Sequence, residues 1–397
     1  MTLATTAERP PALDPRDALA LDALLTEEEL ALRGRVRRYV EERFAPRVGE
    51  LFERARFPRE LARELGGLGV LGMHLEGYGC AGASAVEYGL ACLELEAGDT
   101  GLRTFASVQG SLVMTAIHAW GSEEHRRAWL PRMASGEAVG CFALTEPGAG
   151  SDPSSMTTTA RRVGGDWVID GRKRWIGLAS IADVAVVWAR TEDGVRGFLV
   201  PTDAPGFAAR DITGKLSMRA SVQCDIALDG VRVGAGAMLP GARGLRGAFT
   251  SLNSARYGIV WGVMGAARSA YEAALDYTRE REQFGRPVAG FQLVQQQLVD
   301  MMIAVNRGTL LALHLGRMYD AGRLHPQHIS IGKLDNTRQA LAVARTARGL
   351  LGGNGITLEH PVMRHMVNLE SPLTYEGTPE VHTLILGHAL TGIRAFA

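Results

Sequence analysis

The apolar residues of this chain follow a helical period, then an alternating one, then a helical period again. From about residue 25 to 134 they recur at intervals of three and four, which is typical of amphipathic helices. From about 140 to 247 short runs of β-branched and aromatic residues favour strands. From about 248 the helical spacing returns and persists. This pattern predicts an all-β segment between two helical ones.

The β segment contains three Asp-Gly pairs that we expect to form hairpin turns. Asp-Gly supplies the positive φ angles that tight two-residue hairpins require. The predicted turns are Asp170-Gly171, Asp193-Gly194 and Asp229-Gly230. Short strands joined by such turns indicate an antiparallel barrel or sandwich.

The helical segments carry their own start and stop signals. Thr26, with Glu29 three residues later, has the spacing of a capping box. A long helix is expected after Pro287, and the next is expected to end at Gly352-Gly353. We therefore predict an N-terminal helical domain at 1–137, a central β domain at 138–247 and a C-terminal helical bundle at 248–397.

Composition excludes several classes of function. The 43 basic and 43 acidic residues cancel, so no net field attracts nucleic acid or an anionic membrane. The four cysteines form no C-x-x-C pair, and Pro326 separates His325 from His328, so we expect no metal site. The N-terminus lacks an apolar signal region and no stretch of eighteen apolar residues occurs. We predict a cytoplasmic protein that does not insert into membranes.

Residues 67–72, GLGVLG, match the G-x-G-x-x-G pattern of dinucleotide-binding folds. That fingerprint requires a strand before it and a helix that opens at it. Here the helical sequence PRELARELG precedes the motif, and strands do not alternate with helices along the chain. We therefore expect a helix end and a tight turn at this motif.

Residues 142–155, FALTEPGAGSDPSS, suggest a binding loop at the junction of the helical and β segments. Exposed backbone N–H groups and hydroxyls suit a neutral ligand rich in hydrogen-bonding groups, such as a flavin ring. Trp175 follows in KRWIG. Alone it is typical of a core tryptophan, but together with the loop it indicates a site.

Glu376, in the segment TYEGT, is an acid in a segment that otherwise has the character of a buried one. Its closest cationic residues in the sequence are Arg364 and Arg394, so we expect its carboxyl group to be unpaired. A carboxylate becomes an effective base when apolar walls exclude water and raise its pKa to roughly 6–7.

Five segments, FALTEPGAGSD, KRWIG, REQFGRPVAGFQLVQ, LLGGNGI and TYEGT, occur in the order and spacing of acyl-CoA dehydrogenases. The chain resembles this family over nearly its whole length. The resemblance implies a mainly α fold with a central β-barrel, a helical N-terminal domain and a C-terminal four-helix bundle. It also implies FAD as cofactor and assembly as a homotetramer, a dimer of dimers.

Further segments, including EAGDTGLRTFASVQGSLVM and SARYGIVWGVMGAA, look most like glutaryl-CoA dehydrogenases. By this resemblance, Glu96, Arg103 and Ser107 match the group that binds the substrate's carboxylate. An Arg in an acyl pocket would be a buried, unpaired charge, for which a dicarboxylic acyl group supplies the partner. The alternative for Arg103 is a surface position at a helix end.

The resemblance also implies a mechanism. Glu376 removes the α-proton of the acyl thioester and a hydride passes to the flavin. With glutaryl-CoA, loss of CO2 follows, and the proton on Glu376 completes crotonyl-CoA in a pocket that Tyr375 and Glu96 border. Electrons pass to an electron-transfer flavoprotein. A non-decarboxylating dehydrogenase, or one for another anionic acyl-CoA, fits Arg103 equally well.

The remaining site residues are assigned by the same resemblance. The cofactor-binding positions are Phe142, Leu144, Thr145, Gly150, Ser151, Trp175, Gly177, Arg281, Gln283, Phe284, Gly353, Thr378 and Glu380. Among these, Arg281, Gln283 and Phe284 resemble a group that reaches the FAD of a neighbouring subunit. Ser151 is also assigned to substrate binding, and Arg256 to the pantetheine arm of CoA. Gly177 departs from the family pattern, because many members have Thr there.

Overall fold

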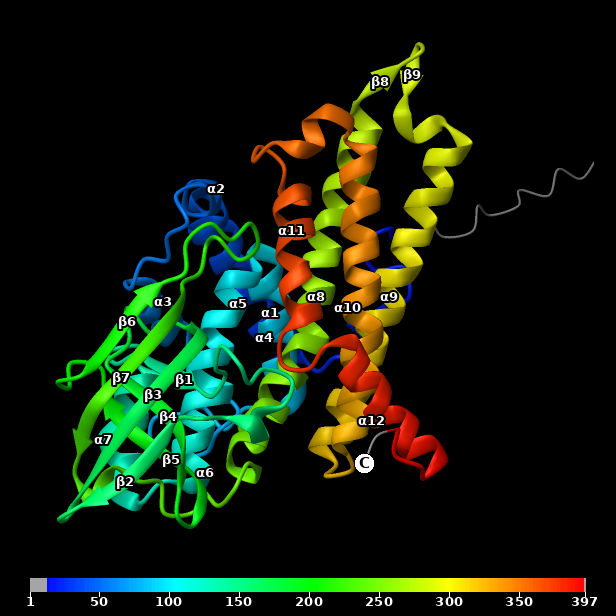
Figure 1. The fold of residues 1–397 in the computed structure, drawn as a ribbon. Coiled ribbons are helices and arrows are strands. Elements are labelled where there is room, and N and C mark those ends of the chain that lie inside the picture. The colour runs from blue at the N-terminus through cyan, green and yellow to red at the C-terminus, as the bar shows by residue number, and fades with distance from the viewer. Residues whose placement is uncertain (1–12, 396–397) are drawn as a thin grey trace, which may run out of the picture.

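The computed structural model describes residues 13–395, which form a twisted sheet, a group of short helices and a bundle of long helices. Figure 1 shows the sheet and the long helices on opposite sides of the molecule, with α4 and α5 between them. α4 packs against the long helix α8 over much of its length. The central helices therefore connect the two parts that the change of period predicts.

The N-terminal helices begin where the sequence signals predict. Thr26 Oγ1 accepts a hydrogen bond from the Glu29 N–H at 3.3 Å, and Glu29 Oε2 accepts one from the Thr26 N–H at 2.9 Å. The predicted capping box is therefore confirmed. The helices of this part are α1 (Glu27–Tyr39), α2 (Ala45–Glu53), α3 (Leu61–Leu68), α4 (Ala85–Gly98), α5 (Thr100–Ala106), α6 (Thr115–Trp120) and α7 (Glu123–Ala134).

Two π-helical segments interrupt this part, Val40–Phe44 between α1 and α2 and Ser107–Met114 between α5 and α6. Every residue of Ser107–Met114 is buried. A π turn contains an extra residue relative to an α turn and is often found at functional sites. The second segment begins at Ser107, which the sequence assigns to the substrate pocket.

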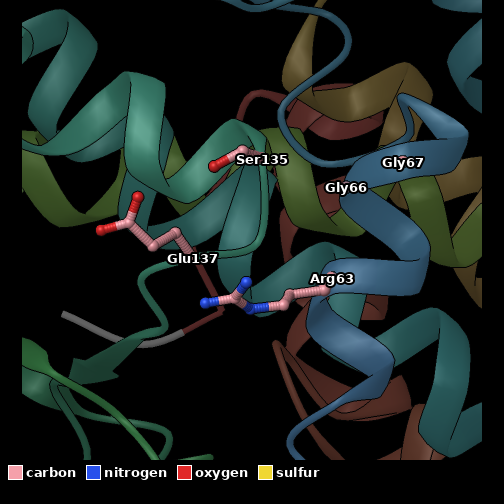
Figure 2. A pocket seen from close by; sticks show the side chains of 5 residues that line it. All are labelled: Arg63, Gly66, Gly67, Ser135 and Glu137. Carbon is pink, nitrogen blue, oxygen red and sulfur yellow. The ribbon is translucent and has the colours of Figure 1, made fainter.

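The G-x-G-x-x-G segment is a helix end, as predicted. α3 ends at Leu68, and Gly69 follows with a φ of 79°. At Gly66 a Cβ atom would lie 2.2 Å from the Ser135 carbonyl oxygen, so glycine permits the contact between α3 and the end of α7. A pocket of about 400 Å³ adjoins this contact. None of the predicted site residues lines it. Its lining residues, drawn in Figure 2, are Arg63, Gly66, Gly67, Ser135 and Glu137.

The sheet has seven strands in the order β1-β4-β2-β3-β7-β6, with β5 paired to β4. Both β1 and β2 run parallel to β4, which the expectation of an antiparallel arrangement missed. The strands are β1 (Gly140–Ala143), β2 (Thr159–Val163), β3 (Asp166–Gly177), β4 (Val184–Thr191), β5 (Gly194–Pro201), β6 (Phe207–Asp211) and β7 (Gln223–Val233).

The predicted β-barrel is confirmed only in part, because the sheet is a curled half-barrel that does not close fully. β5 occupies one edge of β4 along its whole length, whereas β1 and then β2 share the other edge. Closure would need a ladder between the outer strands β5 and β6, and the structure of residues 13–395 contains no such ladder. The three-domain order of helices, sheet and helices is nevertheless as predicted.

Only one of the three predicted Asp-Gly turns forms a hairpin. Asp193-Gly194 connects β4 to β5. Asp170-Gly171 lies inside β3, next to a register shift, and Asp229-Gly230 lies inside β7. The Gly230 N–H donates to Asp170 Oδ1 at 2.7 Å, so these two pairs stabilise each other across neighbouring strands. Long-range pairing has overridden the local turn preference.

The C-terminal part consists of long helices that pack side by side (Figure 1). α9 begins after Pro287, and α10 ends just before Gly352-Gly353, as predicted. In the described part of the chain, α9 is the one helix long and apolar enough to cross a membrane, and half of its apolar stretch is buried. The elements are α8 (Arg246–Glu280), α9 (Gln292–Asp320), α10 (Pro326–Leu350), α11 (Pro361–Thr374) and α12 (Pro379–Thr391), with the hairpin β8 (Glu282–Gln283) and β9 (Arg286–Pro287).

Candidate active site

Glu376 lies in a tight loop between α11 and α12. α11 ends at Thr374, and Thr378 caps α12 by accepting a hydrogen bond from the Val381 N–H at 3.4 Å. The φ angles of Glu376 and Gly377 are 56° and 103°, so both residues lie in the left-handed region. For a glutamate this conformation costs roughly 1–3 kcal/mol and persists only where the surroundings hold it.

Glu376 is half-buried, and its Oε2 atom is buried with no hydrogen-bond partner among the described residues. Burial raises its pKa, whereas the positive charges of Arg103, Lys333 and Arg256 partly oppose this rise. The expectation of an unpaired carboxyl group agrees with the structure, because Oε2 has no partner among the described residues, although the fold brings cations that are distant in sequence close to it. The pKa nevertheless remains above its ordinary value, as a base for proton transfer requires.

Two cations from different helices hold the backbone of this loop. Arg256 on α8 donates from Nε to the Glu376 carbonyl oxygen at 2.6 Å. Lys333 on α10 donates from Nζ to the Gly377 carbonyl oxygen at 2.7 Å. The sequence assigns Arg256 to the pantetheine arm, and that role stays a prediction. Lys333 does not appear among the residues that the sequence singles out.

Arg103 lies at the centre of a buried polar cluster beside this loop. Its side chain and that of Glu96 are both 0% exposed, so the alternative of a surface Arg is wrong. Nε donates to Glu96 Oε2 at 2.6 Å, and Nη2 donates to the Tyr375 hydroxyl at 2.7 Å. The expectation of an unpaired Arg is also wrong, because Glu96 balances its charge. One donor group, Nη1, has no partner among the described residues.

The surrounding helices fix the position of Arg103. Asp99 caps α5, accepting from the Gly101 N–H at 2.7 Å, and its other oxygen accepts from Arg364 at 2.6 Å and Asn368 at 2.8 Å. These bonds tie the start of α5 to α11, the helix that ends at Tyr375. The helix that carries Arg103 and the helix that precedes Tyr375 are therefore fixed relative to each other.

A glycine on α8 makes room for the Glu96–Arg103 pair. A Cβ atom at Gly262 would lie 2.1 Å from Glu96 Oε2 and 3.1 Å from Arg103 Nε. On the other side, the Ser107 hydroxyl is buried without a partner among the described residues. The structure thus brings together Glu96, Arg103, Tyr375 and Glu376, with Ser107 one helical turn beyond Arg103.

The loop after β1 is held by a buried ion pair. Lys173 on β3 donates to Glu146 at 2.9 Å and to the Leu144 carbonyl at 3.0 Å. Glu146 also accepts from the N–H groups of Thr157 at 2.6 Å and Thr158 at 3.0 Å. Although burial opposes its ionisation, these hydrogen bonds and Lys173 lower the pKa of Glu146 to about 2.

This ion pair leaves one face of the loop open to solvent. Phe142 and Leu144 are buried, whereas Gly150 and Ser151 are exposed and Thr145 is half-buried. No atom of the structure would crowd a Cβ at Gly150. The loop therefore presents backbone and a hydroxyl, as the flavin-ring assignment requires.

Trp175 is not a core residue, because it is 52% exposed. Its φ is 61°, and the register of β3 against β7 shifts between Lys173 and Ile176. The irregularity turns the indole outward. At Gly177, half-buried at the end of the same strand, a Cβ atom would lie 3.4 Å from Val108 in the π-helical segment.

The other predicted cofactor residues belong to the C-terminal part of the chain, not to the loop after β1 or to β3. Arg281, Gln283 and Phe284 are exposed around the β8–β9 hairpin, at the end of the bundle away from α12 (Figure 1). Phe284 is 93% exposed. Gly353 is exposed beyond the end of α10, whereas Thr378 and Glu380 begin α12. The roles of these residues stay predictions.

The sequence reasoning missed several residues that position the site. Lys333, Lys173, Glu146 and Gly262 make the contacts described above. The chain contains only three lysines, Lys173, Lys215 and Lys333. In a chain whose cations are otherwise arginines, that rarity is a signal that could have directed attention to them.

Three family models match the chain in consecutive segments. The N-terminal, middle and C-terminal domains of acyl-CoA dehydrogenase match residues 26–137, 141–231 and 242–391. These matches leave only short segments outside the family models.

Solved structures and characterised relatives agree with these matches. A glutaryl-CoA dehydrogenase from Mycobacterium smegmatis in complex with FADH2 is 54% identical, with a TM-score of 0.96, over 97% of this chain and all of that one. Another glutaryl-CoA dehydrogenase structure from this organism is 58% identical, with the same TM-score and coverage. The human mitochondrial short-chain specific acyl-CoA dehydrogenase is 33% identical over 90% of this chain and 89% of its own length.

Proposed function

This chain belongs to the acyl-CoA dehydrogenase family, and from that premise we propose that it oxidises and decarboxylates glutaryl-CoA to crotonyl-CoA and CO2. The observation that carries the choice of substrate is Arg103, a fully buried guanidinium with an unpartnered Nη1 beside Glu376. An acyl tail that ends in a methyl group would leave this donor unsatisfied, whereas a terminal carboxylate would accept from it.

The family depends on FAD, and the residues present fit this group. The exposed backbone at Gly150, the exposed indole of Trp175 and the half-buried backbone of Gly177 suit a flat ring with polar edges. Phe142, Leu144, Thr145 and Ser151 would hold this ring from the adjoining loop. When bound, FAD accepts the hydride equivalent that leaves the β-carbon of the acyl group.

The protein's own residues handle the proton and the charge. Glu376 accepts the α-proton at its buried carboxylate, which the raised pKa makes a stronger base than an exposed glutamate. Arg256 and Lys333 do not form ion pairs with this carboxylate among the described contacts but hold the loop carbonyls instead. Glu376 therefore stays free to receive the proton while its backbone is fixed.

Arg103 and Tyr375 orient the distal end of the substrate. After oxidation, the bond to the distal carboxylate breaks, CO2 leaves, and its electron pair is delocalised toward the thioester. The proton held on Glu376 then adds to the terminal carbon and completes crotonyl-CoA. Glu96 neutralises Arg103, so the pocket holds the carboxylate less firmly than an unpaired Arg would, which favours its departure.

A second function within this family retains the same site. A dehydrogenase that stops at the unsaturated dicarboxylic product, or that oxidises another anionic acyl-CoA, would use Arg103 and Glu376 in the same way. We also propose that electrons pass to an electron-transfer flavoprotein, that the enzyme is a cytoplasmic homotetramer, and that Arg281, Gln283 and Phe284 reach the cofactor of a neighbouring subunit.

The test is to incubate the purified flavoprotein with glutaryl-CoA and an artificial electron acceptor and to identify the products by mass. Crotonyl-CoA and an equal amount of CO2 are expected. Glutaconyl-CoA without CO2 would favour the non-decarboxylating alternative. If glutaryl-CoA stays intact while butyryl-CoA reduces the flavin, the proposed substrate is wrong.

A further inference from the structure

Lys333 is a buried cation to which the proposed mechanism gives no chemical step. It lies in the N-terminal third of α10, and only 1% of its surface is exposed. Its ammonium donates to the Gly377 carbonyl oxygen at 2.7 Å. Within residues 13–395 no carboxylate oxygen lies within ion-pair distance of Lys333. A buried ammonium without an ion-pair partner is costly, so a compensating function is expected.

The other two lysines of the chain make their hydrogen bonds outside the loop that carries Glu376. Lys173 is paired with Glu146, and Lys215 donates to the carbonyls of Met218 and Ser221 in a loop outside the site. Lys333 differs from both because its acceptor belongs to the peptide unit that directly follows the candidate base. Lys215 therefore provides a matched control, a partly buried lysine that also donates to main-chain carbonyls.

The loop that carries Glu376 is held at adjacent positions from two directions. Arg256 holds the Glu376 carbonyl from α8, and Lys333 holds the Gly377 carbonyl from α10. His382 packs against Gly377, where a Cβ would lie 2.7 Å from its Nε2, and its Nδ1 is 3.0 Å from the hydroxyl of Ser330. Ser330 is one helical turn before Lys333, so α10 supports the loop at two points.

We propose that Lys333 is a positioning residue for the base. Its hydrogen bond fixes the left-handed peptide units of Glu376 and Gly377, and its charge keeps the neighbouring carboxyl ionised before substrate binds. The inference rests on the proposed function only in taking Glu376 as the base; it does not depend on which acyl-CoA is oxidised.

The charged groups around Lys333 determine how removing its charge changes the pKa of Glu376. They are Glu376 in the loop, Arg256 on α8 and Arg103 on α5; His382 on α12 also faces it, with its pKa lowered to about 3 by burial and the nearby cations. Burial lowers the pKa of Lys333 to about 7, although Glu376 partly opposes this change. Removing the Lys333 charge raises the pKa of Glu376, so the acidic limb of kcat moves to higher pH.

Stability separates this role from a structural one. Lys333→Met keeps the length of the side chain but removes a buried charge, so the melting temperature is expected to stay level or rise. If Lys333 served only to hold the fold together, the melting temperature and the activity would fall together. A loss of activity without a loss of stability is therefore the signature of the positioning role.

The experiment compares the flavoprotein and its Lys333→Met and Lys215→Met variants in kcat and KM across pH, together with their melting temperatures. For Lys333→Met we expect kcat near neutral pH to fall about 10- to 100-fold, because the base is displaced. KM should change less than about 3-fold. The acidic limb of the profile of kcat against pH should move to higher pH by roughly one unit. For Lys215→Met the limb should not move.

A limb at the wild-type pH, or a fall in kcat that only tracks a fall in melting temperature, would overturn the proposal. If Lys333→Met does not fold, Lys333→Gln removes the same charge while keeping an amide donor, and an unmoved limb in that variant has the same meaning. A wild-type enzyme inactive on glutaryl-CoA would refute the proposed substrate alone. The same comparison made with butyryl-CoA would then still test Lys333.

Discussion

The double substitution Arg103→Met with Glu96→Gln tests whether Arg103 recognises a terminal carboxylate. Both residues must change together because each is fully buried and balances the other's charge. Removing Arg103 alone would leave Glu96 as an unpaired buried charge, at a cost of about 3–5 kcal/mol in folding stability. That loss would obscure any effect on the substrate.

The size of the effect follows from the one free donor. Nε and Nη2 of Arg103 are already bonded to Glu96 and Tyr375, which leaves Nη1 for the substrate. A hydrogen bond between charged groups contributes about 1.5–3 kcal/mol. Its loss should lower kcat/KM for glutaryl-CoA by about 10- to 100-fold. Butyryl-CoA has no terminal carboxylate, so its kcat/KM should change by less than about 3-fold or should rise.

The assay is the ratio of kcat/KM for glutaryl-CoA to that for butyryl-CoA, measured with the same electron acceptor. A control is Arg268→Met with Glu94→Gln, which removes another buried ion pair, joined at 2.6 Å between α8 and α4, and leaves only the partly exposed Arg37 without its partner. The control should leave the ratio unchanged. Equal losses for the two substrates in the Arg103 variant would refute the reasoning, because they would mean that Arg103 shapes the pocket without binding the carboxylate.

Three further predictions concern packing and pH. Glu94→Gln removes a carboxylate that Arg37 and Arg268 share across α1, α4 and α8, so chemical denaturation should show a loss of about 3–5 kcal/mol in unfolding free energy. Burial raises the pKa of Glu94, but these arginines outweigh it and hold the pKa at about 2, below the ordinary 4.5. Its contribution, about 3 kcal/mol, is therefore present above about pH 4.5 and lost as the pH falls toward 2, and melts of Glu94→Gln should show a weaker acid dependence. Gly262→Ala would place a methyl group 2.1 Å from Glu96 Oε2 and should lower the preference for glutaryl-CoA over butyryl-CoA in the same kinetic assay.

The sequence predicts the kinds of elements well but not which strands pair. Apolar period depends on which face of each element is buried, and that is a local property. Whether the sheet closes depends on partners far apart in the chain, such as β1 and β2, which share one edge of β4. The same limit explains Asp170-Gly171, whose local turn preference lost to pairing between β3 and β7.

The candidate site shows the same division. Glu376 and Arg103 are recognisable because their motifs are contiguous. Their electrostatic surroundings are not, because Lys333 contacts Gly377 across 44 residues and Arg256 contacts Glu376 across 120. Resemblance to a family identified the residues in the motifs, but only the folded chain shows that Arg103 is already neutralised by Glu96.

The number of residues in the π-helical segment Ser107–Met114 helps to determine substrate specificity. Each residue of a regular α-helix advances the side-chain direction by about 100°. Deleting one residue from this segment would favour a plain α-helix and change the phase between α5 and α6 by that amount. Since Asp99 ties the start of α5 to α11, Arg103 would keep its place, whereas Ser107 and the residues after it would face other directions although all are still present in the sequence. The extra residue sets which side chains meet, so we expect a change in the number of residues there to alter substrate choice while leaving Glu376 intact.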